Sequence, residues 1–383
     1  MPTPPSTPTP PPPPVGPVEP EVPLPNAAAS QAFKCRNCGA PTRWDPDADA
    51  LKCDHCEAVT PVPRAQAAIV ERPLEAHAQA EKGMGVALRA SRCSTCGATV
   101  ALGASETATA CVFCGSANVL PQEANRNALR PESLIPLDVG RAKVEQAFRA
   151  WIGSRWFRPN ALKHTKEFRA IGVYVPYWTF DCDAHSDWSA DAGYYYYVTV
   201  PTTVFVNGKP RVVMRQERRV RWEPAWGARD DHYDDLLVLA SKGISEELAD
   251  KLGAFELKAL VPYRPEYLAG WRAEEYQIDL EGAWERGKQK VAAAQEARCS
   301  KDVPGDTQRN LAVHNTLSNI RWKHVLLPVW SLSYQFQGRP YSVLIHGQSA
   351  RIVGEAPLSW VKIALLVAGV AAAAGVAAIA ANA

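Results

Sequence analysis

The sequence lacks an excess of charge of either sign, because its 383 residues carry 42 Lys and Arg against 40 Asp and Glu. A chain so evenly balanced has no overall electrostatic attraction for nucleic acid. It also lacks the G-x-S-x-G, H-E-x-x-H and G-x-G-x-x-G motifs of hydrolases, zinc proteases and dinucleotide-binding enzymes. We therefore expect neither an enzyme nor a protein with a small-molecule substrate.

The N-terminus lacks the basic residues and the apolar core of a secretory signal. Residues 1–25 hold thirteen prolines and no Lys or Arg, so they cannot act as a leader of that kind. A segment of this composition buries too little apolar surface to fold and samples extended conformations. We expect residues 1–30 to be a proline-rich disordered tract.

The sequence does have cysteine in a pattern. Eight of its ten cysteines form two copies of the spacing C-x2-C-x14-C-x2-C. Each C-x2-C is a tight turn that points two sulfurs at one spot, and two such turns supply the four thiolates that tetrahedral Zn2+ prefers. The predicted ligands of two zinc ions are Cys35, Cys38, Cys53 and Cys56, and then Cys93, Cys96, Cys111 and Cys114. Rubredoxin-like iron and paired redox dithiols are the alternatives.

These spacings predict two zinc ribbons, at 31–60 and 91–120, joined by a linker at 61–90. Four sulfurs leave no open coordination position, so both zinc ions should be structural. Neither ribbon is basic: Phe33 to Thr60 has four basic and five acidic residues, and Ser91 to Asn118 has one of each. We therefore expect no nucleic-acid binding by the ribbons. Their aromatic residues Phe33, Trp44 and Phe113 are candidate partner contacts, unless they pack on their own zinc loops.

Residues 131–357 predict an α+β domain with antiparallel strands. Apolar residues recur at helical spacing from Asp138 to Gly153, and strand patterns follow at Arg169–Phe180, Tyr194–Val206 and Arg211–Trp222. There is also a short internal echo: VPYWTF at 175–180 resembles LPVWSL at 327–332. Since proline belongs at strand edges or bulges, we expect two equivalent kinked strands with their tryptophans in the core.

The C-terminus predicts a transmembrane tail anchor at 359–381. Ile363 to Ala381 is 19 residues without a charge, and as a helix it would be about 28 Å long. A buried alanine-rich helix is the alternative, since ten of the nineteen are alanine. Basic residues precede the span and none follows it, so the positive-inside rule predicts a single-pass protein of the cytoplasmic membrane with most of the chain on the cytoplasmic side.

The chain from Phe33 to Lys362 resembles bacterial membrane-anchored tandem-zinc-ribbon proteins often labelled "primosomal protein N'-like" or "superfamily II helicase". The cysteine sets carry the resemblance, with four further stretches: VYVPYW at 173–178, YLAGW at 267–271, KHVLLPVW at 323–330 and GEAPLSW at 354–360. The helicase label reflects cysteine spacing, since the sequence has no complete nucleotide-binding loop and no acidic ATPase motif. The resemblance implies association with flotillin-like (SPFH-domain) or phage-shock-type membrane-stress proteins.

The expected fold is therefore multi-domain: two small zinc ribbons, an α+β domain with antiparallel strands, and a C-terminal transmembrane helix. The expected function is a membrane-anchored, cytoplasm-facing adaptor that binds a protein partner through its ribbons. The alternative is a membrane-tethered nucleic-acid-binding protein of replication or repair, which would need a basic surface that is hidden when charge is averaged over the chain.

Overall fold

The structure is a computed structural model of the full chain. It describes residues 33–381, except 65–67, 86–87, 104–107, 155, 161, 163–167, 207 and 338. The predicted proline-rich tract at 1–30 lies outside the described residues.

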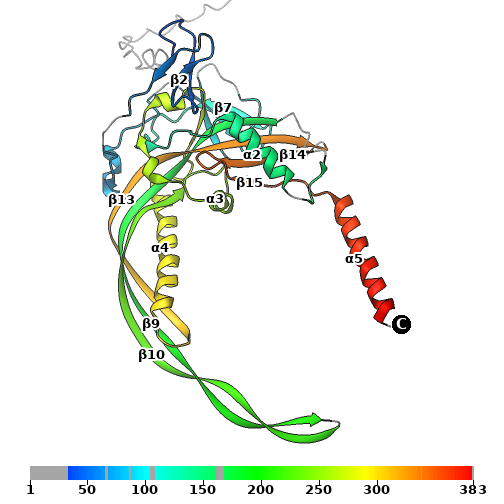
Figure 1. Ribbon diagram of the computed structural model, residues 1–383. Helices are drawn as coiled ribbons and strands as arrows, with labels where there is room; N and C mark the ends of the chain where they lie inside the picture. Colours follow the sequence, from blue (N-terminus) through cyan, green and yellow to red (C-terminus); the bar gives the residue numbers. More distant parts are fainter. Residues whose placement is uncertain are drawn as a thin grey trace, which may run out of the picture.

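The strands of the described chain form two β-sheets (Figure 1). A three-stranded sheet contains β1 (Thr42–Asp45), β2 (Ala50–Cys53) and β3 (Val59–Pro61). The large sheet contains β4 (Arg72–Pro73), β5 (Leu88–Cys93), β6 (Thr99–Gly103), β7 (Val119–Glu123), β8 (Ser133–Leu134), β9 (Phe168–Val206), β10 (Lys209–Leu239), β11 (Val261–Pro262), β12 (Arg272–Glu275), β13 (Thr307–Phe336), β14 (Arg339–His346) and β15 (Ile352–Gly354).

Helices are few among the described residues. The α-helices are α2 (Arg141–Gly153), α3 (Glu246–Leu252), α4 (Leu280–Asp302) and α5 (Trp360–Ala381), and the 3-10 turns are η1 (Leu74–Gln79), η3 (Leu257–Ala259) and η4 (Pro265–Leu268). The helix predicted from Asp138 to Gly153 is α2.

The predicted fold class is wrong. In place of a separate α+β domain following two small ribbons, the chain forms one large mixed sheet whose main path runs in the order β11-β8-β13-β9-β12-β6-β5-β7. The three strands of the second cysteine module, β5 to β7, belong to this sheet, because β6 pairs antiparallel with β12. Sequence periodicity misses such a connection, because it reports the structure of a segment and not which segment it pairs with.

The segments predicted as separate strands join into unusually long ones. Between the segments predicted at 169–180 and 194–206, every second residue of β9 is buried, although the residues that alternate with these are polar. The buried residues are Cys182, Ala184, Ser186, Trp188, Ala190 and Ala192. This two-residue period holds one face of the strand against the protein without a turn. β9 therefore runs for 39 residues, and it pairs with β13 up to Gly193 and with β10 from Tyr177 onward.

The echo of 175–180 in 327–332 marks a local two-fold arrangement. β9 and β13 pair antiparallel around Val175 and Leu327. Each strand has a parallel neighbour first, β12 for β9 and β8 for β13, and then an antiparallel hairpin partner, β10 for β9 and β14 for β13. Pro176 and Pro328 stand where the neighbour changes, so the missing N–H of each proline falls between two ladders.

The tryptophans of the two echo segments occupy equivalent positions. Both are buried, and each donates a hydrogen bond to the residue that precedes the N-cap of a helix. Nε1 of Trp178 donates to the carbonyl of Ile278 at 2.9 Å, and Nε1 of Trp330 donates to that of Val139 at 2.9 Å. Ile278 and Val139 occupy the same position, one residue before the N-cap of α4 and of α2 respectively. A tryptophan of β9 thus fixes the start of α4, and a tryptophan of β13 fixes the start of α2.

One hairpin of this pair is far longer than the other. β14 has eight residues, whereas β10 has 31. β13 accompanies β9 only as far as the pair Thr307 and Gly193. Beyond it, residues 194–206 of β9 and 209–222 of β10 continue as a two-stranded ribbon, which we call the arm and which curves away below the body in Figure 1.

The predicted transmembrane tail anchor at 359–381 is wrong, and so is the predicted single-pass location at the cytoplasmic membrane. Across the part of the chain that the structure describes, no helix combines the length and the apolar character that a membrane crossing needs. α5 is rich in alanine, whose one methyl group contributes little apolar area per residue. The prediction gave the absence of a polar face more weight than the small apolar surface that so many alanines provide.

We predict that Trp178→Ala costs about 3–5 kcal/mol of unfolding free energy, because it empties a fully buried site and orphans the Ile278 carbonyl. The matched control is Trp226→Ala, whose side chain is 78% exposed and whose loss should change stability by less than about 0.5 kcal/mol. Denaturant titration of both variants measures the difference. Equal effects would contradict the assignment of Trp178 to the centre of the fold.

Candidate metal centres

Four tight turns with the same backbone hydrogen bonds present the eight predicted ligands. In each turn the N–H of the first cysteine bonds a carbonyl five residues on, and the carbonyl of that cysteine accepts an N–H from four residues on. The residue at the latter position has a positive φ in all four turns. It is Gly39, Gly97 or Gly115 in three of them, as expected for such turns, and Glu57 in the fourth.

The turns bring the sulfurs together in two separate groups of four. In the first, Sγ of Cys35 lies 3.5 Å from that of Cys56, and Sγ of Cys38 lies 3.5 Å from that of Cys53. The corresponding distances in the second, Cys93 to Cys114 and Cys96 to Cys111, are both 3.6 Å. Within each group all four sulfurs lie within 4.8 Å of one another. Both groups could therefore hold a metal ion.

Each group contains a sulfur that favours the thiolate. A hydrogen bond with Cys96 lowers the pKa of Cys111 to about 5, and the N–H of Ala58 is the main cause that lowers the pKa of Cys56 to about 6. The pKa of Cys96 is raised, chiefly by its hydrogen bond with Cys111. Four adjacent thiolates repel one another, so a bound cation would be needed to ionise the whole set.

The first module docks on the body through Trp44. This side chain is only 1% exposed. Its Nε1 donates to the carbonyl of Leu137 at 3.1 Å, its carbonyl accepts from Nε1 of Trp271 at 3.0 Å, and its ring meets that of Tyr267 edge-on at 4.7 Å. The suggestion that Trp44 offers a free contact to a partner is therefore wrong, because the body occupies it.

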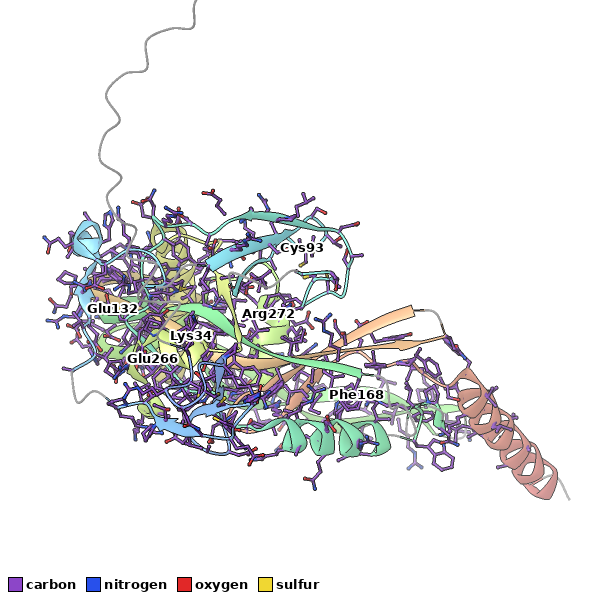
Figure 2. All side chains as sticks on the ribbon, turned by 90° about the horizontal axis from the view of Figure 1, so that it is seen from above. Lys34, Cys93, Glu132, Phe168, Glu266 and Arg272 are labelled. Carbon is purple, nitrogen blue, oxygen red and sulfur yellow. The ribbon has the colours of Figure 1, made fainter. Side chains whose placement is uncertain are left out.

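The second module is fixed in the same way, at the point where its second pair of cysteines turns. Phe113 is 5% exposed and packs beside Gly243 and Ala98. The hydroxyl of Ser331, on β13, donates to the carbonyl of Val112. Figure 2 labels Cys93 of this module, and also Lys34, the neighbour of Cys35 in the first. Phe113 is thus unavailable to a partner as well, and Phe33 is half-buried against the main core.

A third cluster, which the sequence pattern did not single out, contains the carboxyl groups of Glu71, Asp181 and Asp235. Burial raises the pKa of Asp181 to about 6. Nζ of Lys323 lies 2.9 Å from Glu71 Oε1 and 2.6 Å from Asp235 Oδ1. The Lys323 ammonium thus already bridges two of the three carboxyl groups and ties together segments that are far apart in the sequence, so we assign the cluster a structural role.

The chain is similar to the "uncharacterized protein YdjG" of Bacillus subtilis (strain 168). The two are 27% identical over 247 residues, which is 63% of this chain and 68% of YdjG. A match of this length is much longer than either cysteine module, so the likeness includes part of the large sheet. No family model matches the chain, and no solved structure matches it.

Glu274, on β12 beside the second module, generates a pH prediction. Burial raises its pKa to about 8, although the hydrogen bond that it accepts from the Ser241 hydroxyl at 2.8 Å acts in the opposite direction and lowers the pKa. A folded-state pKa above the unfolded value means that the folded protein holds the proton more tightly. Stability should therefore fall by up to about 1.4 kcal/mol per pH unit as pH rises from roughly 4.5 to 8.

Glu274→Gln should remove that decline and make the protein more stable than the wild type at pH 7. The matched control is Glu296→Gln, at an exposed position of α4. Unfolding free energies measured by denaturant titration at several pH values give the two slopes. A Glu274→Gln variant with the wild-type slope would show that this carboxyl is already ionised in the folded protein.

Proposed function

We propose that both four-cysteine groups bind zinc and that the metal is structural. A tetrahedron with Zn–S bonds of about 2.3 Å has edges of about 3.8 Å, close to the sulfur separations of 3.5–3.6 Å in both groups. All four positions would be filled by sulfur, so the ion would fix the turns and offer no site for substrate. Zinc would thereby hold Trp44 and Phe113 in their buried docking positions.

Purified protein should contain two zinc ions per chain, and elemental analysis can count them. Loss of one ligand should have different effects in the two modules. Cys53→Ser should lose one zinc and disorder the three-stranded sheet. Cys111→Ser should also lower the stability of the large sheet, because β5 to β7 belong to it. Iron with visible absorption, fewer than two metals, or equal thermal shifts for the two variants would contradict this assignment.

We propose further that the chain is an adaptor that binds a protein partner, and that the arm is its binding element. The observation that supports this is an exposed apolar face. Residues paired across an antiparallel ladder share a face, so the register places one set of side chains on one side of the arm. That set, the apolar face, is Tyr195, Tyr197, Thr199, Pro201, Thr203, Phe205, Pro210, Val212, Met214, Gln216, Arg218, Val220 and Trp222.

The far part of the apolar face is uncovered in the isolated chain, whereas Arg309 of β13 stacks on Trp222 next to the body. Phe205, Val212 and Met214 are 75%, 69% and 67% exposed. A two-stranded ribbon is only marginally stable in water, and a run of large apolar side chains on a free surface favours association. The equivalent hairpin, β13 with β14, turns after a few residues, so the fold itself does not require the extra length. The arm is therefore best explained by what it binds.

The resemblance noted from the sequence suggests which partners to test. Flotillin-like (SPFH-domain) proteins and phage-shock-type proteins of the same organism are the first candidates. Binding through the arm replaces the expectation that the aromatic residues of the ribbons make the contact, since Trp44 and Phe113 are buried.

The test is a titration of the purified chain with each purified candidate. A triple variant, Phe205→Ser, Val212→Ser and Met214→Ser, should weaken binding at least about tenfold, since buried apolar anchors dominate protein interfaces. The matched control is Val198→Ser, Val200→Ser and Val213→Ser, which changes the same number of apolar residues on the opposite face of the arm. Equal affinity of the two triple variants, or no binding of either candidate, would contradict the proposal.

A further inference from the structure

The other face of the arm combines basic side chains on β10 with valines, among them Val198, Val200 and Val204 on β9. The register places Lys209, Arg211, Arg215, Arg219 and Arg221 together, with Glu217 as the one acidic side chain among them. Tyr194 and Tyr196 lie on the same side, opposite Arg221 and Arg219. We call this side the basic face. Its arginines at 211, 215 and 219 recur every four residues, about 13 Å apart along the strand.

Most of this charge is available to a ligand. All five cationic residues are exposed. Arg219 lies 3.6 Å from Glu217 and Arg221 lies 2.9 Å from Glu223. Within the described residues, no carboxylate forms an ion pair with Lys209, Arg211 or Arg215. Exposed ion pairs such as the first two contribute little and can be exchanged for another anion.

The chain separates its charge along this one ribbon. The arm has six Lys or Arg and one Glu, whereas residues 181–193 and 223–235, between the arm and the body, have nine Asp or Glu and one Arg. The near-zero total therefore conceals a basic segment at the far end and an acidic one next to the body. The basic segment attracts a polyanion, and the acidic segment repels it, so the contact is limited to the arm.

The shape of the arm favours one kind of polyanion. Figure 1 shows the arm as a coiled two-stranded ribbon. At about 3.3 Å per residue, residues 194–206 span roughly 43 Å, which exceeds one turn of duplex DNA at about 34 Å. The major groove of B-form DNA admits a two-stranded β-ribbon, whereas the major groove of A-form RNA is too narrow. Arginine and tyrosine side chains supply the phosphate contacts such a complex needs.

We propose that the basic face of the arm binds double-stranded DNA through its phosphates, without strong sequence preference. This activity is additional to the protein-binding role of the apolar face and uses different side chains. It also differs from nucleic-acid binding by the cysteine modules, whose own charge remains balanced. The two faces would let one arm hold DNA and a protein at the same time.

The experiment is a fluorescence-anisotropy titration of the full chain with a labelled duplex of about two helical turns. Four phosphate contacts would weaken binding roughly 100-fold between about 50 and about 200 mM salt. A variant with Lys209→Gln, Arg211→Gln and Arg215→Gln should lose at least about tenfold in affinity at the lower salt. The matched control, Arg36→Gln, Arg126→Gln and Lys143→Gln, removes the same charge from exposed positions off the arm and should bind as the wild type does.

Two further measurements make the outcome decisive. Thermal melts of both variants should match the wild type, because every changed residue is exposed. The apolar-face triple variant should keep its DNA affinity, so a failure of the protein-binding role would not be mistaken for a failure of this one.

Three results would overturn the proposal: no duplex binding at the lower salt, equal losses in the basic-face and control variants, or tighter binding to single-stranded DNA or to duplex RNA. Light scattering covers a remaining alternative. A dimer that the basic-face variant dissociates, without DNA binding, would show that the arm meets the acidic segment of a second copy.

Discussion

The pairing of β9 with β13 is the interaction on which the rest of this structure depends. Around Val175 and Leu327 the two strands form a local two-fold centre, and each then recruits a parallel strand, a hairpin partner and a helix. The crossed hydrogen bonds of Trp178 and Trp330 tie each strand to the helix start of the other half. Because these contacts are reciprocal, neither half can form its buried centre alone. The core therefore has to fold as one unit, although its parts are far apart in the sequence.

Each cysteine module packs on this centre through a buried aromatic side chain, and the second module is also joined to it by the pairing of β6 with β12. Trp44 docks the first module between Leu137, Trp271 and Tyr267, and Phe113 docks the second beside Gly243. A small module of this kind buries little apolar surface, so a bound metal would supply much of its order. The metal's contribution to the whole protein would then be to keep two docking side chains in register with the sheet.

The sequence predicts the local structure of a segment better than it predicts which distant segment that segment pairs with. Cysteine spacing indicated both groups of four, because a C-x2-C turn is set by neighbouring residues, and the echo placed Trp178 and Trp330 in the core. The joining of β6 to β12 and the unbroken run of β9 were missed, since pairing between distant segments leaves no short-range pattern. The tail at 359–381 was misjudged because an uncharged alanine-rich run resembles an apolar one. The basic arm was missed because charge was counted over the whole chain and over the ribbons, and not over one hairpin.

β9 extends beyond its last pair with β13, so that the chain presents a two-stranded arm with no further strand beside it among the described residues. Hydrogen exchange of backbone amides in the isolated, metal-loaded protein tests it most directly. The claim predicts that amides of residues 194–206 and 209–222 exchange orders of magnitude faster than those of residues 172–182, which lie between neighbours on both sides. Equal protection of the two regions in a protein that light scattering shows to be monomeric would contradict it, because the arm would then have to be covered by the chain itself.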